Sequence, residues 1–201
     1  MYDNNVSFPF AFHSIFVTLP KDKKEGMTHY KDLLRQRRSY RKFSDEEISG
    51  DDVQLLLRAA LMSPSSMNRQ SWQFVVVDDK MALEKLSDAK DHGATFLRDA
   101  PLAIVITGNP LENDCWVEDG SIAATSMLFQ AEELGLGACW IQIRNRGLSD
   151  GTMAEDVVLG ILDIPEEMRV LSIIAFGHPL ERLPEHDEEQ LKWENVHIGT
   201  F

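Results

Sequence analysis

A dense cluster of cations occupies residues 33–43, LLRQRRSYRKF. The chain carries 20 Lys and Arg residues against 33 Asp and Glu residues, a formal net charge of −13, yet five of the cations fall within eight consecutive positions. Neighbouring guanidinium groups repel one another, and the planar Arg fork suits a phosphate. The cluster therefore predicts a site for a small anionic ligand, with a plain solvated turn as the alternative. Its members are Arg35, Arg37, Arg38, Arg41 and Lys42.

A second polar stretch, SPSSMNRQSWQF at residues 63–74, lies between a predicted helix and a predicted strand. Pro64 fixes the backbone, and Ser65 and Ser66 offer hydroxyl groups. Asn68 and Gln70 carry amides that both donate and accept hydrogen bonds. This mixture suits the edge of a heterocycle that presents alternating carbonyl and N–H groups, although an ordinary Ser or Asx turn is the alternative.

Several other kinds of site are disfavoured. Cys115 and Cys139 form neither a disulfide framework nor a zinc set, and the six histidines are scattered, so no metal site is expected. A pI near 4.8 argues against nucleic acid and anionic membranes as partners. Gly135 and Gly137 follow a predicted helix and precede a predicted strand, which is the reverse of a dinucleotide-binding fingerprint. We expect a cytoplasmic protein, because no apolar run is long enough to span a bilayer.

Hydrophobic patterning predicts helices that alternate with strands apolar on both faces, which indicates a central sheet covered on both sides. The fold class expected is α+β, a three-layer α/β/α sandwich. Residues 1–26 are interpreted as an extension, 27–181 as the domain and 182–201 as a C-terminal arm. The predicted helices are 28–36, 49–62, 80–89, 118–134 and 153–164, and the predicted strands are 72–79, 100–108, 138–143 and 169–177.

Four stretches in order resemble the FMN-dependent nitroreductase family. They are RRSYRKF, SPSSMNRQSWQFVVV, VEDGSIAATSMLFQAEELGLGACWI and IIAFGHPLE, which together span about residues 28–181. The resemblance implies a central mixed sheet and an intertwined homodimer with two FMN molecules in its interface. It also implies NADH or NADPH as electron donor, and an arm that packs on the partner subunit.

The resemblance also assigns residues to the flavin. It places Arg37, Arg38, Ser39 and Arg41 at the phosphate, the ribityl chain and the pyrimidine edge. It places Pro64, Ser65 and Ser66 at the flavin from the partner subunit, and Asn68 at the ring from the same side as the arginines. The strand after GLG passes flavin N5 in the family, which points to Ile141, Gln142 and Ile143.

This sequence departs from the family pattern at two places. Ser71 stands where the proline that follows the Gln70-type glutamine is usual, which could loosen the loop. Many members place a C-terminal Lys or Arg on the phosphate, whereas this tail offers Lys192 and His197. Arg144 or Arg146, just after the third predicted strand, could take that role instead.

The resemblance predicts an oxidoreductase that moves two electrons from NAD(P)H through flavin N5 to a nitroaromatic, a quinone or a similar small acceptor, in a ping-pong cycle. The cofactor performs the redox step, so no catalytic side chain is expected. A guanidinium near the pyrimidine edge, here Arg41, would stabilise the reduced anionic ring. Two alternatives stay open: a non-catalytic flavin-binding or sensory dimer, and a specialised flavin enzyme such as a reductive dehalogenase.

Overall fold

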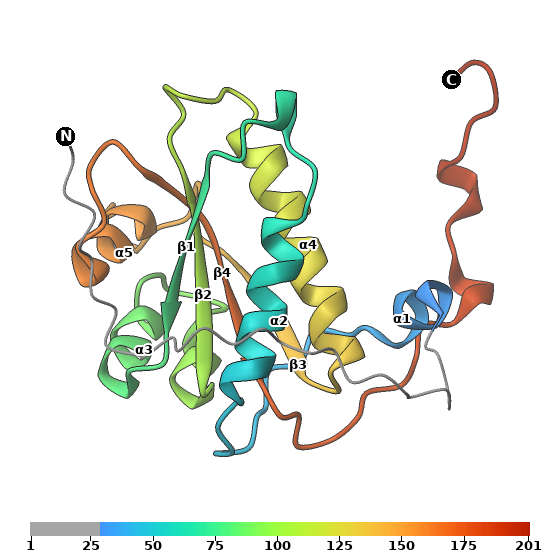
Figure 1. The fold of residues 1–201 in the computed structure, drawn as a ribbon, viewed down its shortest axis with the longest axis horizontal. Coiled ribbons are helices and arrows are strands. Elements are labelled where there is room, and N and C mark those ends of the chain that lie inside the picture. Colours follow the sequence, from blue (N-terminus) through green and yellow to red (C-terminus); the bar gives the residue numbers. More distant parts are fainter. Residues whose placement is uncertain (1–28) are drawn as a thin grey trace.

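Four strands form a single sheet in the order β1-β2-β4-β3 in the computed structural model, which describes residues 29–201 (Figure 1). All three strand pairings are antiparallel, and one parallel bridge joins Ser39 to Ala138. The expected mixed sheet is therefore corrected. Helices that cover both faces give the same apolar pattern whichever way the strands run, so the pattern could not reveal strand direction. The strands are β1 (Trp72–Val77), β2 (Leu102–Gly108), β3 (Gly137–Gln142) and β4 (Arg169–Gly177).

Two helices cover each face of the sheet, which confirms the three-layer α+β sandwich (Figure 1). Side chains alternate along a strand, so β2 supplies both layers of the core. Ala103 and Val105 pack toward one pair of helices, while Ile104 and Ile106 pack toward the other pair. The first pair is α3 (Lys80–Ser87) and α5 (Ala154–Leu162), and the second is α2 (Gly50–Leu61) and α4 (Trp116–Glu133).

Local capping fixes where the helices begin. Ser49 caps α2, and its hydroxyl accepts a hydrogen bond from the Asp52 amide at 3.1 Å. Asp79 caps α3 in the same way, through the Ala82 amide at 2.8 Å. Such caps satisfy backbone donors that have no partner inside the helix. Every predicted helix and strand is present, and each end lies within two residues of its predicted place.

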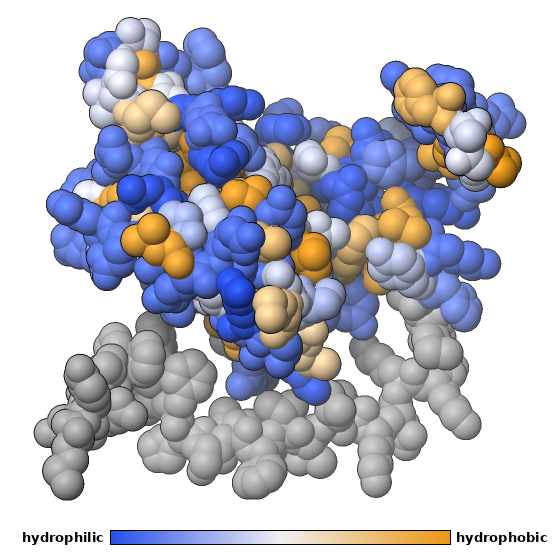
Figure 2. Space-filling view, turned by 90° about the horizontal axis from the view of Figure 1, so that it is seen from above, coloured by the Kyte–Doolittle hydropathy of each residue, from blue (hydrophilic) through white to orange (hydrophobic). Residues whose placement is uncertain are grey.

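Helix α1 (Tyr30–Gln36) and the C-terminal arm stand apart from the three layers, on the side of α4 (Figure 1). The arm contains two short 3-10 turns, Glu188–Gln190 and Trp193–Asn195. Figure 2 shows apolar side chains on this projecting part of the molecule. The exposed apolar residues of the arm are Leu191, Trp193, Val196, Ile198 and Phe201.

Two further expectations concern the division of the chain into segments and the absence of a membrane-spanning run. The predicted extension, residues 1–26, lies outside the described residues, so the division into extension, domain and arm remains a prediction. Within residues 29–201, none of the helices is both long enough and apolar enough to cross a membrane.

Candidate functional site

The basic loop that follows α1 runs along the exposed edge of β3. The Tyr40 amide donates to the Ala138 carbonyl at 3.0 Å, next to the parallel bridge of Ser39. Farther along, Phe43 bridges to Pro179. An edge strand has unpaired backbone groups, and the loop satisfies part of them. Backbone pairing therefore fixes the course of the loop, independently of its charged side chains.

Two buried aromatic rings anchor the loop on the sheet. Tyr40 packs on Gly137, where a Cβ atom would lie 2.8 Å from the Tyr40 side chain. Phe43 packs on Gly177, where a Cβ atom would lie 2.7 Å from the Phe43 ring. Both distances are too short for any side chain larger than hydrogen. Glycine at these two positions therefore permits the close approach that holds the loop.

The cations of this loop have few acidic partners. Among residues 29–201, no carboxylate lies within 4.0 Å of Arg37, Arg38, Arg41 or Lys42. This is unusual in a chain with 33 acidic side chains. Arg41 donates to the Ser39 carbonyl at 3.3 Å, and its guanidinium lies over the Phe96 ring at 5.9 Å from the centroid. A donor set of unpaired guanidinium groups fits the phosphate of FMN.

A shallow pocket of about 170 Å³ opens beside these cations. The loop contributes four of its lining residues, and the segment that leads into the C-terminal arm contributes two. The lining consists of Ser39, Tyr40, Arg41, Lys42, Glu181 and Leu183.

Lys90, which follows α3, contacts the end of β3 near the same cluster. Its ammonium donates to the Gln142 carbonyl at 2.8 Å, and burial lowers its pKa, an effect that the Arg146 charge reinforces. Burial raises the pKa of the Cys139 thiol on β3, while the charges of Arg41, Lys90 and Arg37 oppose that rise. Arg37, Arg41 and Lys90 thus all act on the pKa of the same thiol on β3. Sequence reasoning missed Lys90, because a lone lysine after a helix carries no signal of its own.

The end of β3 presents polar groups next to this cluster. The Gln142 side chain accepts from the Trp140 indole at 3.0 Å and donates to the Arg144 carbonyl at 2.9 Å. Arg144 lies over the Trp116 ring, 5.9 Å from its centroid. Ile141 is buried in the core, so only its backbone can face a ligand. Ile141 and Gln142 thus lie at the end of β3, with Arg144 just beyond it, and their contacts with a flavin stay predictions.

The second polar stretch lies at the opposite end of α2 from the basic loop (Figure 1). A helix of 12 residues spans about 18 Å, so Pro64, Ser65 and Ser66 are not brought to the arginines of their own chain. This separation agrees with their assignment to the partner subunit. Asn68, whose amide bonds to the Ser65 carbonyl at 3.0 Å, belongs to the same loop. Within one chain, Asn68 therefore lies with Ser65 and Ser66 and not beside the arginines, and its contact with the flavin ring stays a prediction.

Two arginines of the cluster hold the arm instead of standing free. Arg38 donates to the Pro184 carbonyl, and Arg35 forms ion pairs with Glu185 at 2.6 Å and Glu188 at 3.5 Å. His186 completes the contact, because its amide donates to the Arg35 carbonyl at 2.8 Å. Arg35 and Arg38 thus tie the arm to the basic loop. Arg37 also contacts the arm, because its guanidinium lies 3.4 Å and its carbonyl 3.1 Å from the Nε2 atom of His186. Arg37 and Arg41 have no ion-pair partner among residues 29–201, which leaves their charges for an anionic ligand.

The residues predicted to contact the phosphate of FMN lie in different parts of the structure. Lys192 is exposed on the arm, and the His197 ring stacks on Phe201 with centroids 4.3 Å apart. Arg146 lies close enough to Lys90 to affect its pKa. Arg146 thus acts on a lysine that is bonded to the end of β3.

An antiparallel sheet between two helical layers, with a cationic loop along one sheet edge, defines a class of α+β proteins suited to an anionic ligand. Within this class the chain belongs to the nitroreductase family, whose model matches residues 34–91 and 85–178. This confirms the predicted family and fold. The enzyme class and the cofactor that were predicted agree with the proteins that the chain resembles.

Three of the proteins that the chain resembles illustrate the range of activities that their names describe. A solved structure titled FMN-dependent nitroreductase, from Clostridium difficile R20291, is 42% identical with a TM-score of 0.82, over 84% of this chain and 98% of that one. A protein of Archaeoglobus fulgidus, provisionally named NADH dehydrogenase/NAD(P)H nitroreductase, is 36% identical over 73% of this chain and 83% of its own length. An iodotyrosine deiodinase of Thermotoga neapolitana is 37% identical over 85% of this chain and 97% of its own length.

Proposed function

We propose that this protein is an NAD(P)H-dependent FMN oxidoreductase that reduces a small nitroaromatic, quinone or similar acceptor in a ping-pong cycle. One observation carries the proposal: Arg37 and Arg41 have no acidic partner in residues 29–201, although the loop that bears them is firmly anchored on β3. Such an arrangement suits a bound phosphate, which the solved relative's title supports through its FMN dependence.

The chain's own residues bind and orient the cofactor. When bound, FMN supplies the two-electron transfer between nicotinamide and acceptor. Arg37 and Arg41 hold its anionic groups, and Lys90 adds a third positive charge that also acts on Cys139 of β3. Burial keeps the Lys90 ammonium poorly solvated, so an anion nearby favours its charged form.

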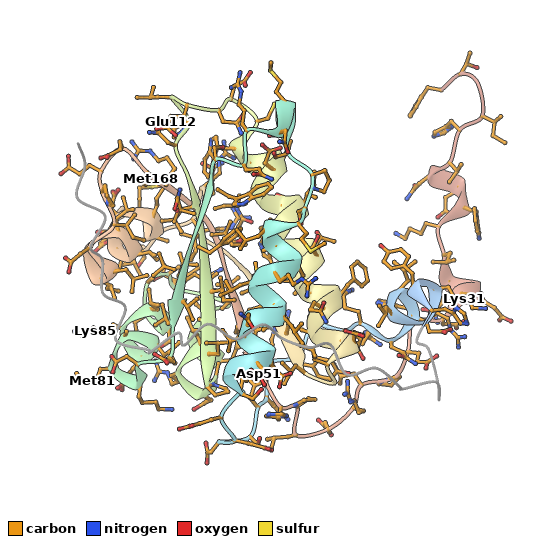
Figure 3. All side chains as sticks on the ribbon, in the orientation of Figure 1. Lys31, Asp51, Met81, Lys85, Glu112 and Met168 are labelled. Atoms are coloured by element: carbon orange, nitrogen blue, oxygen red, sulfur yellow. The ribbon has the colours of Figure 1, made fainter. Side chains whose placement is uncertain are left out.

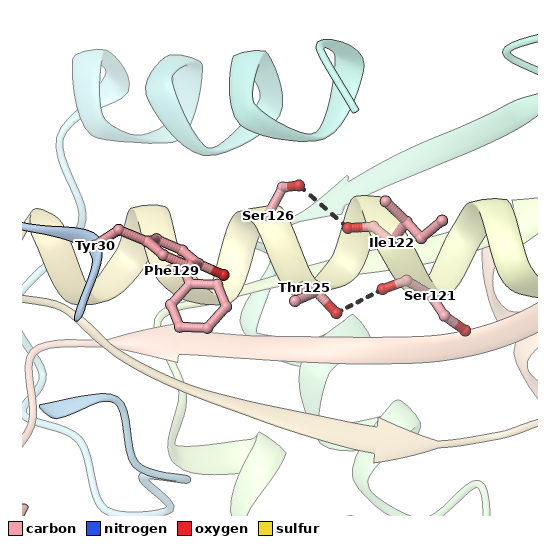
Figure 4. A pocket seen from close by; sticks show the side chains of 6 residues that line it. All are labelled: Tyr30, Ser121, Ile122, Thr125, Ser126 and Phe129. Carbon is pink, nitrogen blue, oxygen red and sulfur yellow. Dashed lines mark hydrogen bonds between the residues drawn. The ribbon is translucent and has the colours of Figure 1, made fainter. Parts of the chain in front are cut away.

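We further propose that two copies of the chain complete each site. The basic loop comes from one copy and the loop of residues 64–68 from the other, because α2 separates them within one chain. A hollow of about 430 Å³ lies on the outer face of α4, beside α1, and Figure 4 shows the side chains that line it. This hollow and the apolar arm are the surfaces expected to contact the partner. The residues that line the hollow are Tyr30, Ser121, Ile122, Thr125, Ser126 and Phe129.

The test replaces Arg37 and Arg41 singly with alanine. Each substitution removes a charge-assisted hydrogen bond of about 1.5–3 kcal/mol, so FMN should bind roughly 10- to 100-fold more weakly. Lys85→Ala is the matched control, since Lys85 is an exposed cation on α3 (Figure 3). Fluorescence titration of FMN with the cofactor-free protein measures the affinity. Unchanged flavin affinity in both arginine variants would contradict the proposal.

Anaerobic reduction distinguishes an enzyme from a flavin-binding dimer. NADH or NADPH should bleach the yellow holoprotein, and an acceptor should restore the colour. If neither nicotinamide bleaches it, the non-catalytic alternative holds.

Reductive dehalogenation is the second candidate, because a relative of 37% identity is named iodotyrosine deiodinase. The loop 109–115 is short in this chain, which leaves little length for a substrate lid. An acceptor panel with a nitroaromatic, a quinone and iodotyrosine decides between them, since halide release from iodotyrosine alone would favour the second candidate.

A further inference from the structure

A buried carboxylate holds the second polar loop. Asp119, in the first turn of α4, is only 3% exposed, and no cation lies within 4.0 Å of it among residues 29–201. One carboxylate oxygen accepts from the Ser66 amide at 2.8 Å, and the other accepts from the Asn113 side chain at 2.7 Å. A buried charge is costly unless hydrogen bonds satisfy it. Both carboxylate oxygens of Asp119 therefore accept hydrogen bonds from segments outside α4.

Asn113 is the second member of this pair. Its amide group donates to Asp119 and also to the Ser71 hydroxyl at 2.8 Å, and its oxygen accepts from the Cys115 amide at 3.0 Å. The side chain is buried and every polar atom has a partner. Asp119 therefore binds one end of the loop at Ser66, and Asn113 binds the other end at Ser71.

The loop between Ser66 and Ser71 has a strained backbone. Met67, Asn68 and Gln70 have φ angles of 51°, 55° and 50°, a left-handed conformation that non-glycine residues adopt only at a cost. Met67 is also 82% exposed, so packing does not hold it. The Arg69 guanidinium adds contacts outside this stretch, to the Glu112 carbonyl at 3.0 Å and to the Asp114 carboxylate at 3.9 Å. Hydrogen bonds inside the loop, such as that from the Gln70 amide to the Ser65 hydroxyl at 3.0 Å, act together with the fixed ends to hold this conformation.

Stabilisation of α4 alone does not account for the burial of the Asp119 carboxylate or for its hydrogen-bond partners. The N-cap of α4 is Cys115, without a side-chain cap, and the Asp119 carboxylate bonds to no amide of its own helix. A carboxylate that served only the helix dipole could stay in water near the N-terminus. Burial and the choice of partners point to the loop.

We propose that Asp119 and Asn113 are positioning residues that hold residues 64–70 in the conformation that receives the flavin bound by the partner copy. This inference rests on the proposed function, in which that loop contacts FMN. Loosening the pair lowers the fraction of loops that are competent to bind, and the apparent dissociation constant rises in inverse proportion to that fraction.

The experiment exchanges the two side chains. Asp119→Asn places an amide group opposite the Asn113 amide, and Asn113→Asp places one carboxylate against another. Each single variant should bind FMN at least tenfold more weakly than the parent protein. The double variant Asp119→Asn with Asn113→Asp restores a donor opposite an acceptor, and it leaves acceptors for the Ser66 and Cys115 amides. The double variant should therefore recover most of the lost affinity.

A cofactor-free readout separates loop conformation from flavin binding. Trypsin should cleave after Arg69 at least tenfold faster in Asp119→Asn than in the parent apoprotein, and the exchanged double variant should resist again. Asp51→Asn is the control, because Asp51 is an exposed acid in the first turn of α2 (Figure 3).

Parent-like FMN affinity and cleavage in Asp119→Asn would overturn the inference and leave the proposed function intact. Loss of affinity in the singles without recovery in the double variant would overturn it as well. If the parent protein does not bind FMN, the proposed function fails, while the cleavage rates still show whether the pair holds the loop.

Discussion

Glu132 on α4 shows how burial changes the behaviour of a single carboxylate. Its side chain is 7% exposed and pairs at 3.1 Å with Arg182, which is 52% exposed. Burial raises the pKa of Glu132 above the ordinary 4.5, and the charges of Arg182 and Arg37 oppose that rise only in part. The folded state therefore takes up a proton before the unfolded state does as pH falls. Folding becomes relatively more stable as pH drops through the raised pKa toward 4.5.

The prediction is that Glu132→Gln is more stable than the parent at pH 7, and that this gain shrinks as pH falls toward 4.5. Urea unfolding at pH 7 and at lower pH, both in the same buffer system, measures the difference between the two proteins. A gain that grows on acidification would contradict the assigned direction of the pKa shift.

Sequence reasoning reached individual site residues only where their local density was unusual. Arg37 and Arg41 stood out because the arginines of the chain are densest at residues 35–41. Lys90 stood alone in sequence and became visible only through its bond to the Gln142 carbonyl. The place of Asn68 relative to the arginines came from the family resemblance alone, because local sequence does not say which residues meet across two copies of a chain.

The basic loop as an element depends on Gly137, and this gives a prediction at the element scale. A methyl group there would meet the Tyr40 ring, so Gly137→Ala should cost about 1–3 kcal/mol of folding stability. It should also weaken FMN binding, because the displaced loop carries Arg37 and Arg41. Thermal unfolding and flavin titration measure the two effects.

Gly160 supplies the matched control. It lies inside α5 with no atom within 4 Å of an added Cβ, so Gly160→Ala should stabilise the protein by about 0.5–1 kcal/mol. Parent-like stability and flavin affinity in Gly137→Ala would show that the loop is not anchored through Tyr40.

Helices and strands themselves were predictable, because periodicity, caps and breakers act locally. Ser49 marked the start of α2, and the apolar runs marked β2 and β4. Strand direction was not predictable, since both faces of the sheet are covered by helices. The left-handed turn at Met67 was equally invisible, because distant contacts at Asp119 and Asn113 enforce it.

At the scale of the whole molecule, one chain does not bring together the two stretches that are proposed to contact the flavin. The basic loop and residues 64–68 lie at opposite ends of α2, about 18 Å apart along the helix axis. Under the proposed division of the site between two copies, flavin affinity should depend on dimerisation. Loss of the dimer should release FMN even when every flavin-contacting residue is intact.

Ile122→Asp tests this dependence. Ile122 is 41% exposed on the outer face of α4, where it lines the hollow between α4 and α1 (Figure 4). A charge buried there without a partner costs several kcal/mol, so the variant should be a monomer in size-exclusion chromatography with light scattering. Its FMN affinity should fall at least tenfold. Met81→Asp on α3, in the opposite layer, is the control and should leave both properties unchanged. A monomeric Ile122→Asp protein with full flavin affinity would show that one chain suffices, and the division of the site between two copies would be wrong.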